Sequence, residues 1–354
     1  MTVDMTSLLA RALAKGASDL HLAVGVPPSL RINGEIIFMD YPALTGEMTR
    51  QLTYSLLSPE HIRRLEKERE IDLSVFLPGI GRCRVNVYHS RGFVESAFRI
   101  IPLEIRSLEE LGLPEVVKEL AMRPKGLVLV AGPAGMGKTT TLAAMIDFIN
   151  EHKRCRIVTI EDPIEYLHQH KKSIVVQREV GVDPTSDTRS FASALRHALR
   201  QDPNIICVGE MRDLDTFAVA MTAAETGHLV MGTIHTVNTI HTITRIIDVF
   251  PPYQQAQIRT QLADCLEGVV AQLLLPRMDG EGRVLATEVL IATPAIRRCI
   301  RDNKLEQIIT HLQTGAEFHM KTMDISLREL YEAGKIDYDT AVSKAQDPRL
   351  FKEL

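Results

Sequence analysis

The chain has 354 residues, a length that suits two ordinary domains, and 45% of its residues are hydrophobic while 24% are charged. The formal net charge is −4, tryptophan is absent and aromatic residues make up only 5%. These values argue against a protein that binds nucleic acid through a basic surface or through stacked aromatic side chains. The sequence has no run of about 18 apolar residues, which a transmembrane helix would need, and its start does not resemble a secretory signal.

The first hundred residues alternate between helical and strand patterns. Apolar spacing predicts a helix over Met5–Lys15 that ends at Gly16, and Thr45 and Ser58 are suited to cap two further helices. Asn33-Gly34 is a strong hairpin signal. Five segments are predicted as strands: Ser18–Val24, Leu30–Ile32, Glu35–Phe38, Arg82–Tyr88 and Phe93–Ile100. We therefore predict a small α+β domain over residues 1–101.

The pattern changes in the rest of the chain. We predict a linker over residues 102–118 and a short helical stretch over Leu108–Met122. From Lys125 the order becomes strand, glycine-rich loop, helix and strand, which predicts a parallel sheet with crossover helices. We therefore assign residues 119–354 to an α/β domain, whose segment from Thr293 onward is mostly helical.

One segment fits the phosphate-binding pattern G-x-x-x-x-G-K-[ST]. It follows the apolar run Gly126–Ala131, which suits a buried parallel strand, and leads into helical spacing over Thr139–Asn150. Backbone N–H groups of such a loop wrap the phosphates, Lys138 is expected to reach the β- and γ-phosphates, and the Thr139 hydroxyl to help hold Mg²⁺. The predicted nucleotide-binding residues are Gly132, Pro133, Ala134, Gly135, Met136, Gly137, Lys138, Thr139 and Thr140.

Acidic residues follow two further apolar segments. Arg156–Ile160 leads into Glu161, and Ile205–Val208 leads into Glu210, at the position of a Walker B acid. Because ligands bind at the carboxyl ends of parallel strands, one acid could support Mg²⁺ while the other orients the attacking water. A helix-capping or surface role remains open for either acid taken alone.

Two histidines flank a fourth predicted strand near residues 228–233. They are His228 and His235, and the sequence offers no third ligand that would make them a metal site. A lone histidine is more often structural than catalytic. The position of His235 beside the acidic segments nevertheless makes it a candidate sensor of the γ-phosphate.

These segments, in this order and spacing, resemble the motifs of the secretion and pilus ATPases. The matching blocks are GPAGMGKTTT, IVTIEDPIEYLH, RQDPNIICVGEMRD and TGHLVMGTIHT, and the resemblance extends to ASDLHLAVGVPPSLRINGE and GRCRVNVYHSRGFVESAFRIIP near the start. Within this family the chain is similar to the type IV pilus retraction ATPases. It lacks the long N-terminal region and the four-cysteine zinc element of assembly ATPases, and TPAIRRCIRDNK at residues 293–304 is similar to a motif linked with retraction.

The resemblance implies a PAS-like N-terminal domain, a RecA-like P-loop ATPase domain and a homohexameric ring that binds ATP and Mg²⁺ but no zinc. It implies that Glu161 is the catalytic acid, that Glu210 supports Mg²⁺ and the γ-phosphate, and that His228 and His235 form a functional pair. The arginines that would act across subunits or bridge the domains are Arg82, Arg84 and Arg99.

The implied activity is ATP hydrolysis that powers pilus retraction and twitching motility. The five cysteines are far apart in sequence, which favours a reduced compartment. The resemblance implies the cytoplasm, at the inner face of the cytoplasmic membrane, with an inner-membrane pilus platform protein as partner and only indirect membrane association. The alternatives are an accessory pilus ATPase, an assembly or type II secretion ATPase, a RecA-like nucleic-acid translocase and a ring that does not hydrolyse ATP.

The chain departs from the family pattern in the phosphate-binding loop and in the retraction-linked motif. Ala134 and Met136 replace the Thr and Ser of the common loop GPTGSGKSTT, whereas Thr139 keeps the hydroxyl. We expect the backbone cradle to be kept and the turnover rate to change. Arg298 and Cys299 replace Asn and Leu in the retraction-linked motif.

Overall fold

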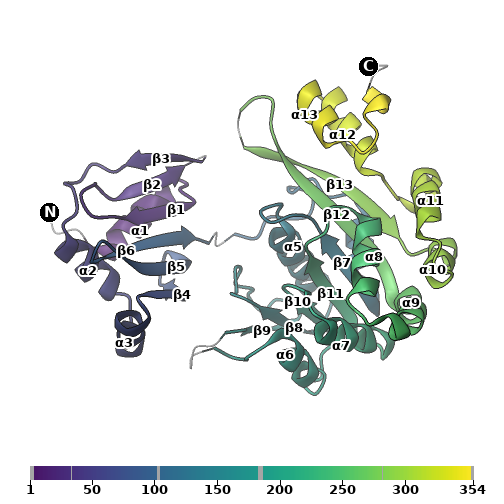
Figure 1. The fold of residues 1–354 in the computed structure, drawn as a ribbon, viewed down its shortest axis with the longest axis horizontal. Helices are drawn as coiled ribbons and strands as arrows, with labels where there is room; N and C mark the ends of the chain where they lie inside the picture. Colours follow the sequence, from purple (N-terminus) through teal and green to yellow (C-terminus); the bar gives the residue numbers. More distant parts are fainter. Residues whose placement is uncertain (1–3, 33, 102–103, 182–185, 281, 352–354) are drawn as a thin grey trace. The chain divides into compact units, whose positions relative to one another are not determined.

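The computed structural model describes residues 4–351 apart from 33, 102–103, 182–185 and 281. The chain divides into two compact units (Figure 1). One unit runs up to Glu104 and includes Glu165–Leu167, and the other contains Ile105–Ile164 and the residues from His168 onward.

The first unit is built on an antiparallel sheet with the strand order β3-β2-β1-β6-β5-β4. Side-chain caps begin its helices, since Asp4, Thr45 and Ser58 each accept a hydrogen bond from the backbone N–H three residues ahead. Its elements are α1 (Met5–Ala14), β1 (Asp19–Leu22), β2 (Ser29–Ile32), β3 (Glu35–Phe38), α2 (Gly46–Tyr54), α3 (Pro59–Glu68), β4 (Glu70–Leu77), β5 (Gly81–Ser90) and β6 (Phe93–Ile100).

The five strands predicted for this unit are present, and β4 was not predicted. In β4 only Ile71 and Leu73 are buried, so the alternation of buried and exposed side chains that marks a strand is weak there. Asn33 of the predicted hairpin turn lies outside the described residues, and Gly34 has the positive φ of +90° that such a turn needs.

The second unit contains a seven-stranded sheet with the order β13-β12-β7-β11-β10-β8-β9. Its strands run parallel except β13, which pairs antiparallel with β12. The strands are β7 (Gly126–Ala131), β8 (Arg156–Glu161), β9 (Ile174–Glu179), β10 (Ile205–Val208), β11 (Leu229–Ile234), β12 (Leu266–Pro276) and β13 (Arg283–Ile291). The sequence predicted β7, β8, β10 and β11 but not β9, β12 or β13.

Helices cover both faces of this sheet (Figure 1). The helices of this unit are α4 (Val116–Ala121), α5 (Lys138–His152), α6 (Phe191–Ala198), α7 (Leu214–Glu225), α8 (Thr239–Asp248), α9 (Pro252–Cys265), α10 (Pro294–Arg301), α11 (Ile308–Thr314), α12 (Met323–Glu332) and α13 (Tyr338–Lys344), and its short 3₁₀ turns are η1 (Leu305–Gln307), η2 (Ala316–Phe318) and η3 (Pro348–Phe351). In the described part of the chain no helix is long and apolar enough to cross a bilayer.

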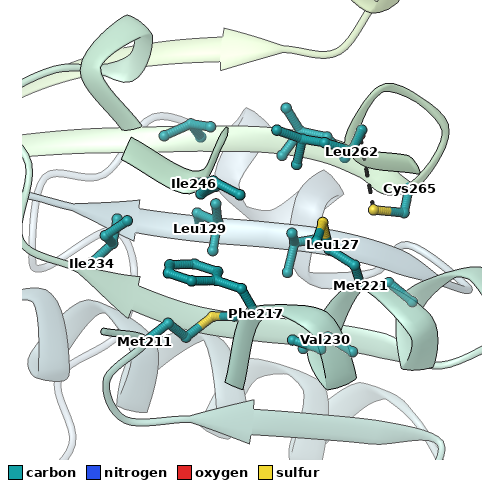
Figure 2. Packing of buried hydrophobic residues seen from close by; sticks show 14 of the residues in the cluster. Leu127, Leu129, Met211, Phe217, Met221, Val230, Ile234, Ile246, Leu262 and Cys265 are labelled. Carbon is teal, nitrogen blue, oxygen red and sulfur yellow. Dashed lines mark hydrogen bonds between the residues drawn. The ribbon is translucent and has the colours of Figure 1, made fainter. Parts of the chain in front are cut away.

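The central strands are buried on both sides because successive side chains point to opposite faces of a sheet. Leu127 and Leu129 of β7 belong to the core beneath α6–α10, whereas Val128 and Val130 belong to the core beneath α4 and α5. Figure 2 shows the first of these cores, in which Phe217 of α7 is fully buried. Two packed layers of helices therefore hold the carboxyl ends of the central strands in fixed positions.

The fold-class prediction is confirmed: a smaller α+β unit precedes an α/β unit with a mainly parallel sheet and a helical C-terminal region. The second unit begins at Ile105, so most of the predicted linker 102–118 lies within it, and Leu108 and Val117 are buried there. Of the helical stretch expected over Leu108–Met122, only Val116–Ala121 is helical.

Candidate nucleotide-binding site

The glycine-rich loop connects β7 to α5, as the motif requires. Gly132, Gly135 and Gly137 all have positive φ, a backbone conformation that other residues adopt only with strain. At Gly132 a Cβ would also lie 2.7 Å from the carbonyl oxygen of Gln272, so the close approach of β12 excludes any side chain there. The loop therefore depends on glycine for its shape as well as for its contacts.

The residues of the loop fit a bound phosphate. No side chain caps the N-terminus of α5, a helix of 15 residues. Its first backbone N–H groups are therefore donors at the positive end of a helix dipole. Lys138 is 7% exposed and its Nζ donates to the carbonyl oxygen of Pro133 at 2.8 Å, so it bends back over the loop. Thr139 stands beside it in the first turn of α5.

The loop is anchored by the β12–β13 hairpin, which the sequence did not predict. Gln272 Nε2 donates to the carbonyl oxygen of Met136 at 2.6 Å, and the backbone N–H of Leu274 donates to the Met136 sulfur at 3.3 Å. Arg283 Nη1 donates to the carbonyl oxygen of Gly135 at 3.2 Å. Met136 replaces the serine of the common family loop and contributes a contact through its sulfur. Gln272 is the one polar side chain in the apolar run VVAQLLL, and this isolated polar residue is the feature of the sequence that could have marked it as functional.

Lys138, His235 and Glu210 form a connected row at the carboxyl ends of β7, β11 and β10. Lys138 Nζ lies 3.4 Å from His235 Nδ1, and His235 Nε2 lies 3.1 Å from Glu210 Oε1. Glu210 also pairs with Arg212, two residues further on. The sequence predicted these three residues separately, and the parallel sheet brings them together because the three strands are neighbours.

The row fixes the protonation of His235. A lysine ammonium can only donate, so Nδ1 of His235 accepts and the ring proton lies on Nε2, which donates to Glu210. Partial burial and the positive charge of Lys138 lower the pKa of His235, although the Glu210 carboxylate acts in the opposite direction. His235 is therefore a neutral donor at neutral pH and lies beside Lys138.

Glu161, the last residue of β8, has an ordered carboxylate. Its Oε1 accepts a hydrogen bond from the fully buried Thr159 hydroxyl at 2.5 Å and another from Gln177 Nε2 at 3.0 Å. Gln177 Oε1 in turn accepts from the backbone N–H of His168 at 2.9 Å. Neither Thr159 nor Gln177 was predicted as a site residue, and Gln177 lies on β9, a strand that was not predicted either.

The ring of His168 is predicted to make the fold sensitive to acid. Burial lowers the pKa of His168 to about 4, whereas an unfolded histidine titrates near 6.5. The unfolded chain therefore binds a proton first, and stability falls as the pH drops from 6.5 towards 4. Between pH 7 and pH 5 we expect this group to lower the free energy of unfolding by about 2 kcal/mol. Urea unfolding at pH 7 and pH 5 measures this difference in the free energy of unfolding. The difference should be smaller in His168→Gln than in the wild type, and an equal difference in both proteins would contradict this prediction.

The structure does not bring His228 to the same place as His235. His228 precedes β11, whereas His235 follows it, so a six-residue strand separates them by roughly 20 Å. His228 Nδ1 donates to the carbonyl oxygen of Ala223 at 3.0 Å, a contact that closes the turn after α7. Within one chain His228 is therefore outside the row formed by Lys138, His235 and Glu210.

The three predicted arginines belong to the first unit. Arg84 of β5 and Arg99 of β6 are exposed and directly opposite one another across the two strands, so they share one face of the sheet. Arg99 Nε donates to Asp19 Oδ1 at 3.1 Å. Arg82 is half-buried two residues before Arg84. The same face also carries Asp19 and Asp72, so these arginines lie among acidic side chains.

The fold and the loop together define a P-loop nucleotide-binding protein of the α/β class. Residues 91–288 match the family model described as "Type II/IV secretion system protein". This chain therefore belongs to that family, within its PilT-like group.

Full-length relatives support this assignment. The chain is 45% identical to the type IV pilus retractation ATPase PilT of Pseudomonas aeruginosa, over 99% of this chain and 100% of the relative. It is 39% identical to the type IV pilus ATPase PilU of the same organism, over 99% of this chain and 92% of the relative. A crystal structure of the pilus retraction motor PilT with bound ADP matches all of both chains, with a TM-score of 0.92 and 49% identity.

Proposed function

We propose that this chain is an ATP-hydrolysing motor that powers type IV pilus retraction and, through it, twitching motility. The observation that carries the proposal is the row of Lys138, His235 and Glu210 beside a complete phosphate-binding loop. The similarity to PilT over the whole length of both proteins supports retraction as the use of the ATP.

In this proposal the loop binds the phosphates through the N–H groups at the start of α5 and through Lys138. Thr139 and Glu210 would hold Mg²⁺, partly through water. The ion, when bound, neutralises charge on the phosphates. His235 donates from Nε2 to Glu210, and a γ-phosphate oxygen would compete with Glu210 for that hydrogen bond. Glu161 orients the attacking water, with Oε1 held by Thr159 and Gln177.

The motor would be a homohexameric ring in the cytoplasm, at the inner face of the cytoplasmic membrane. A ring allows arginines of one subunit to reach the phosphates bound by the next. Guanidinium groups are suited to this, because they donate in a planar fork to phosphate oxygens. We assign this role to the face of the first unit that carries Arg82, Arg84 and Arg99. The partner would be the inner-membrane pilus platform protein, so that membrane association is indirect.

An accessory pilus ATPase is the second candidate, because the chain is also 39% identical to PilU over nearly its whole length. The higher identity to PilT favours the principal motor. A nucleic-acid translocase is disfavoured by the net charge of −4 and by the low content of aromatic residues.

The activity is tested by steady-state ATP hydrolysis of the purified full-length protein. We expect turnover that requires Mg²⁺, disappears with excess EDTA, returns when Mg²⁺ is restored and is unchanged by added DNA. Activity that appears only with DNA, and that falls steeply with salt, would instead indicate a translocase. An absence of hydrolysis with intact ATP binding would identify a ring that does not hydrolyse ATP.

Glu161→Gln is expected to keep ATP binding and to lower kcat by about tenfold or more, since general bases contribute at least that much. The amide oxygen can still accept from Thr159 and Gln177, so the fold is preserved while the negative charge is lost. The companion variant is Glu165→Gln, four residues along the same segment. A loss of turnover in Glu165→Gln but not in Glu161→Gln would remove Glu161 from the proposed role and transfer it to Glu165.

A further inference from the structure

Glu288 is a buried acid in the second unit that the proposed mechanism does not use. It lies on β13 and is 2% exposed. None of the ion pairs within the described part of the chain includes it. A buried carboxylate is costly unless hydrogen bonds replace its water, so the contacts of Glu288 must be favourable and specific.

Each oxygen of Glu288 binds the beginning of a different helix. Oε1 accepts from the backbone N–H of Thr239 at 2.9 Å and from its hydroxyl at 2.7 Å. Oε2 accepts from the backbone N–H of Met323 at 3.3 Å and from Gln346 Nε2 at 3.3 Å. Thr239 and Met323 are the first residues of α8 and α12. The positive ends of two helix dipoles thus replace a counter-cation.

The α8 contact lies close to the candidate site in sequence and in structure. Thr239 is four residues after His235, and the segment between them is also tied to α8, because the hydroxyls of Thr236 and Thr242 lie 2.6 Å apart. The start of α8 therefore determines where the segment after His235 is anchored. The other oxygen of Glu288 holds α12 and Gln346, which lies two residues after the end of α13, so the same carboxylate joins this segment to the C-terminal helices.

We propose that Glu288 is a positioning residue for ATP hydrolysis: it fixes the start of α8, and with it the segment that carries His235, against the C-terminal helices. This inference rests on the proposed function. Glu288 acts through Thr239 and does not itself touch the nucleotide. A displacement of about 1 Å in a group that contacts the reacting atoms can cost up to 100-fold in rate, so loss of this anchor should be measurable.

Glu288→Gln tests the proposal because it keeps the volume of the side chain and replaces one acceptor oxygen by an NH₂ group. That group cannot accept from either helix, so one of the two anchors is lost. We expect kcat to fall about tenfold with KM changed by less than about threefold. We also expect the affinity ratio of ATPγS to ADP to move towards that of His235→Ala. Thr239→Val removes only the hydroxyl donor and should give a smaller change in the same direction.

Asp324→Asn is the matched control. Asp324 is 8% exposed and accepts from the backbone N–H groups of Gln346 and Asp347, so it binds the same C-terminal segment without touching α8. It should lose stability while keeping kcat and the affinity ratio. The inference is overturned if Glu288→Gln folds and keeps the kcat and the affinity ratio of the wild type. It is also overturned if Asp324→Asn changes kcat and the affinity ratio as much as Glu288→Gln does. If the wild type does not hydrolyse ATP, the proposed function fails and the affinity ratio alone decides the role of Glu288.

Discussion

Lys138→Ala is expected to lower kcat by about two to three powers of ten, the usual cost of removing one preorganised donor to an anion. It is also expected to weaken nucleotide binding by about tenfold or more, since a hydrogen bond to a charged group contributes about 1.5–3 kcal/mol. Lys138 is buried over the loop, where its ammonium donates to the carbonyl oxygen of Pro133 and lies beside His235. Its ammonium group therefore lies over the loop. Its removal takes away the one lysine that the loop provides for the β- and γ-phosphates.

Calorimetric titration with ADP and the ADP-induced rise in Tm measure this effect. The control is Lys153→Ala at the other end of the same helix, where Nζ donates to the carbonyl oxygens of Met122 and Arg123. That variant should lose stability but keep its affinity for ADP. If Lys138→Ala bound ADP with the affinity of the wild type, the loop would not be the nucleotide site.

Glu210→Gln is expected to lower kcat by about 10- to 100-fold, the range found when a residue that orients a metal's ligands is removed. The change removes a negative charge at the end of β10, which supports Mg²⁺ in our proposal. It also weakens the acceptor for the Nε2 proton of His235. Because the Glu210 carboxylate raises the pKa of His235, its loss should leave that histidine neutral to a still lower pH.

The measurement is kcat as a function of Mg²⁺ concentration, in which Glu210→Gln should need more Mg²⁺ for half-maximal turnover. Glu225→Gln, an exposed acid on α7 that accepts from Gln261, provides the control and should match the wild type. An unchanged kcat with an unchanged Mg²⁺ requirement in Glu210→Gln would remove this acid from the site.

The parts that the sequence predicted best are those with local causes. The phosphate-binding loop is contiguous, its glycines are required by backbone conformation, and the flanking strand and helix follow within a few residues. The caps at Thr45 and Ser58 are likewise set by a contact only three residues away. Neighbouring parallel strands then place Glu210 and His235 beside the loop, as expected from the carboxyl ends of such strands.

The parts that the sequence did not predict depend on pairing between distant segments. Gln272 and Arg283 hold the loop from a hairpin more than 130 residues away, as the separations of 136 and 148 residues show. The apolar residues of this hairpin show neither the spacing of a helix nor the alternation of a half-buried strand, so β12 and β13 were not predicted. Gln177 reaches Glu161 only because β9 pairs with β8, and β9 carries no distinctive pattern.

His228 illustrates a different limit. The family resemblance implied that His228 and His235, which are seven residues apart, form a functional pair. A strand rises about 3.3 Å per residue, so the same spacing puts them at opposite ends of β11. The extended backbone between the two histidines, and not their closeness in sequence, decides that only His235 joins Lys138 and Glu210.

The central claim, that this protein is a retraction motor, is tested most directly by a clean deletion of its gene in the host, with surface pili counted and twitching scored. We predict abundant pili and lost movement, restored by the wild-type gene but not by Lys138→Ala. Cells without pili would contradict the claim, because the protein would then drive assembly. Unchanged pili and unchanged twitching would contradict it as well and would favour the accessory role.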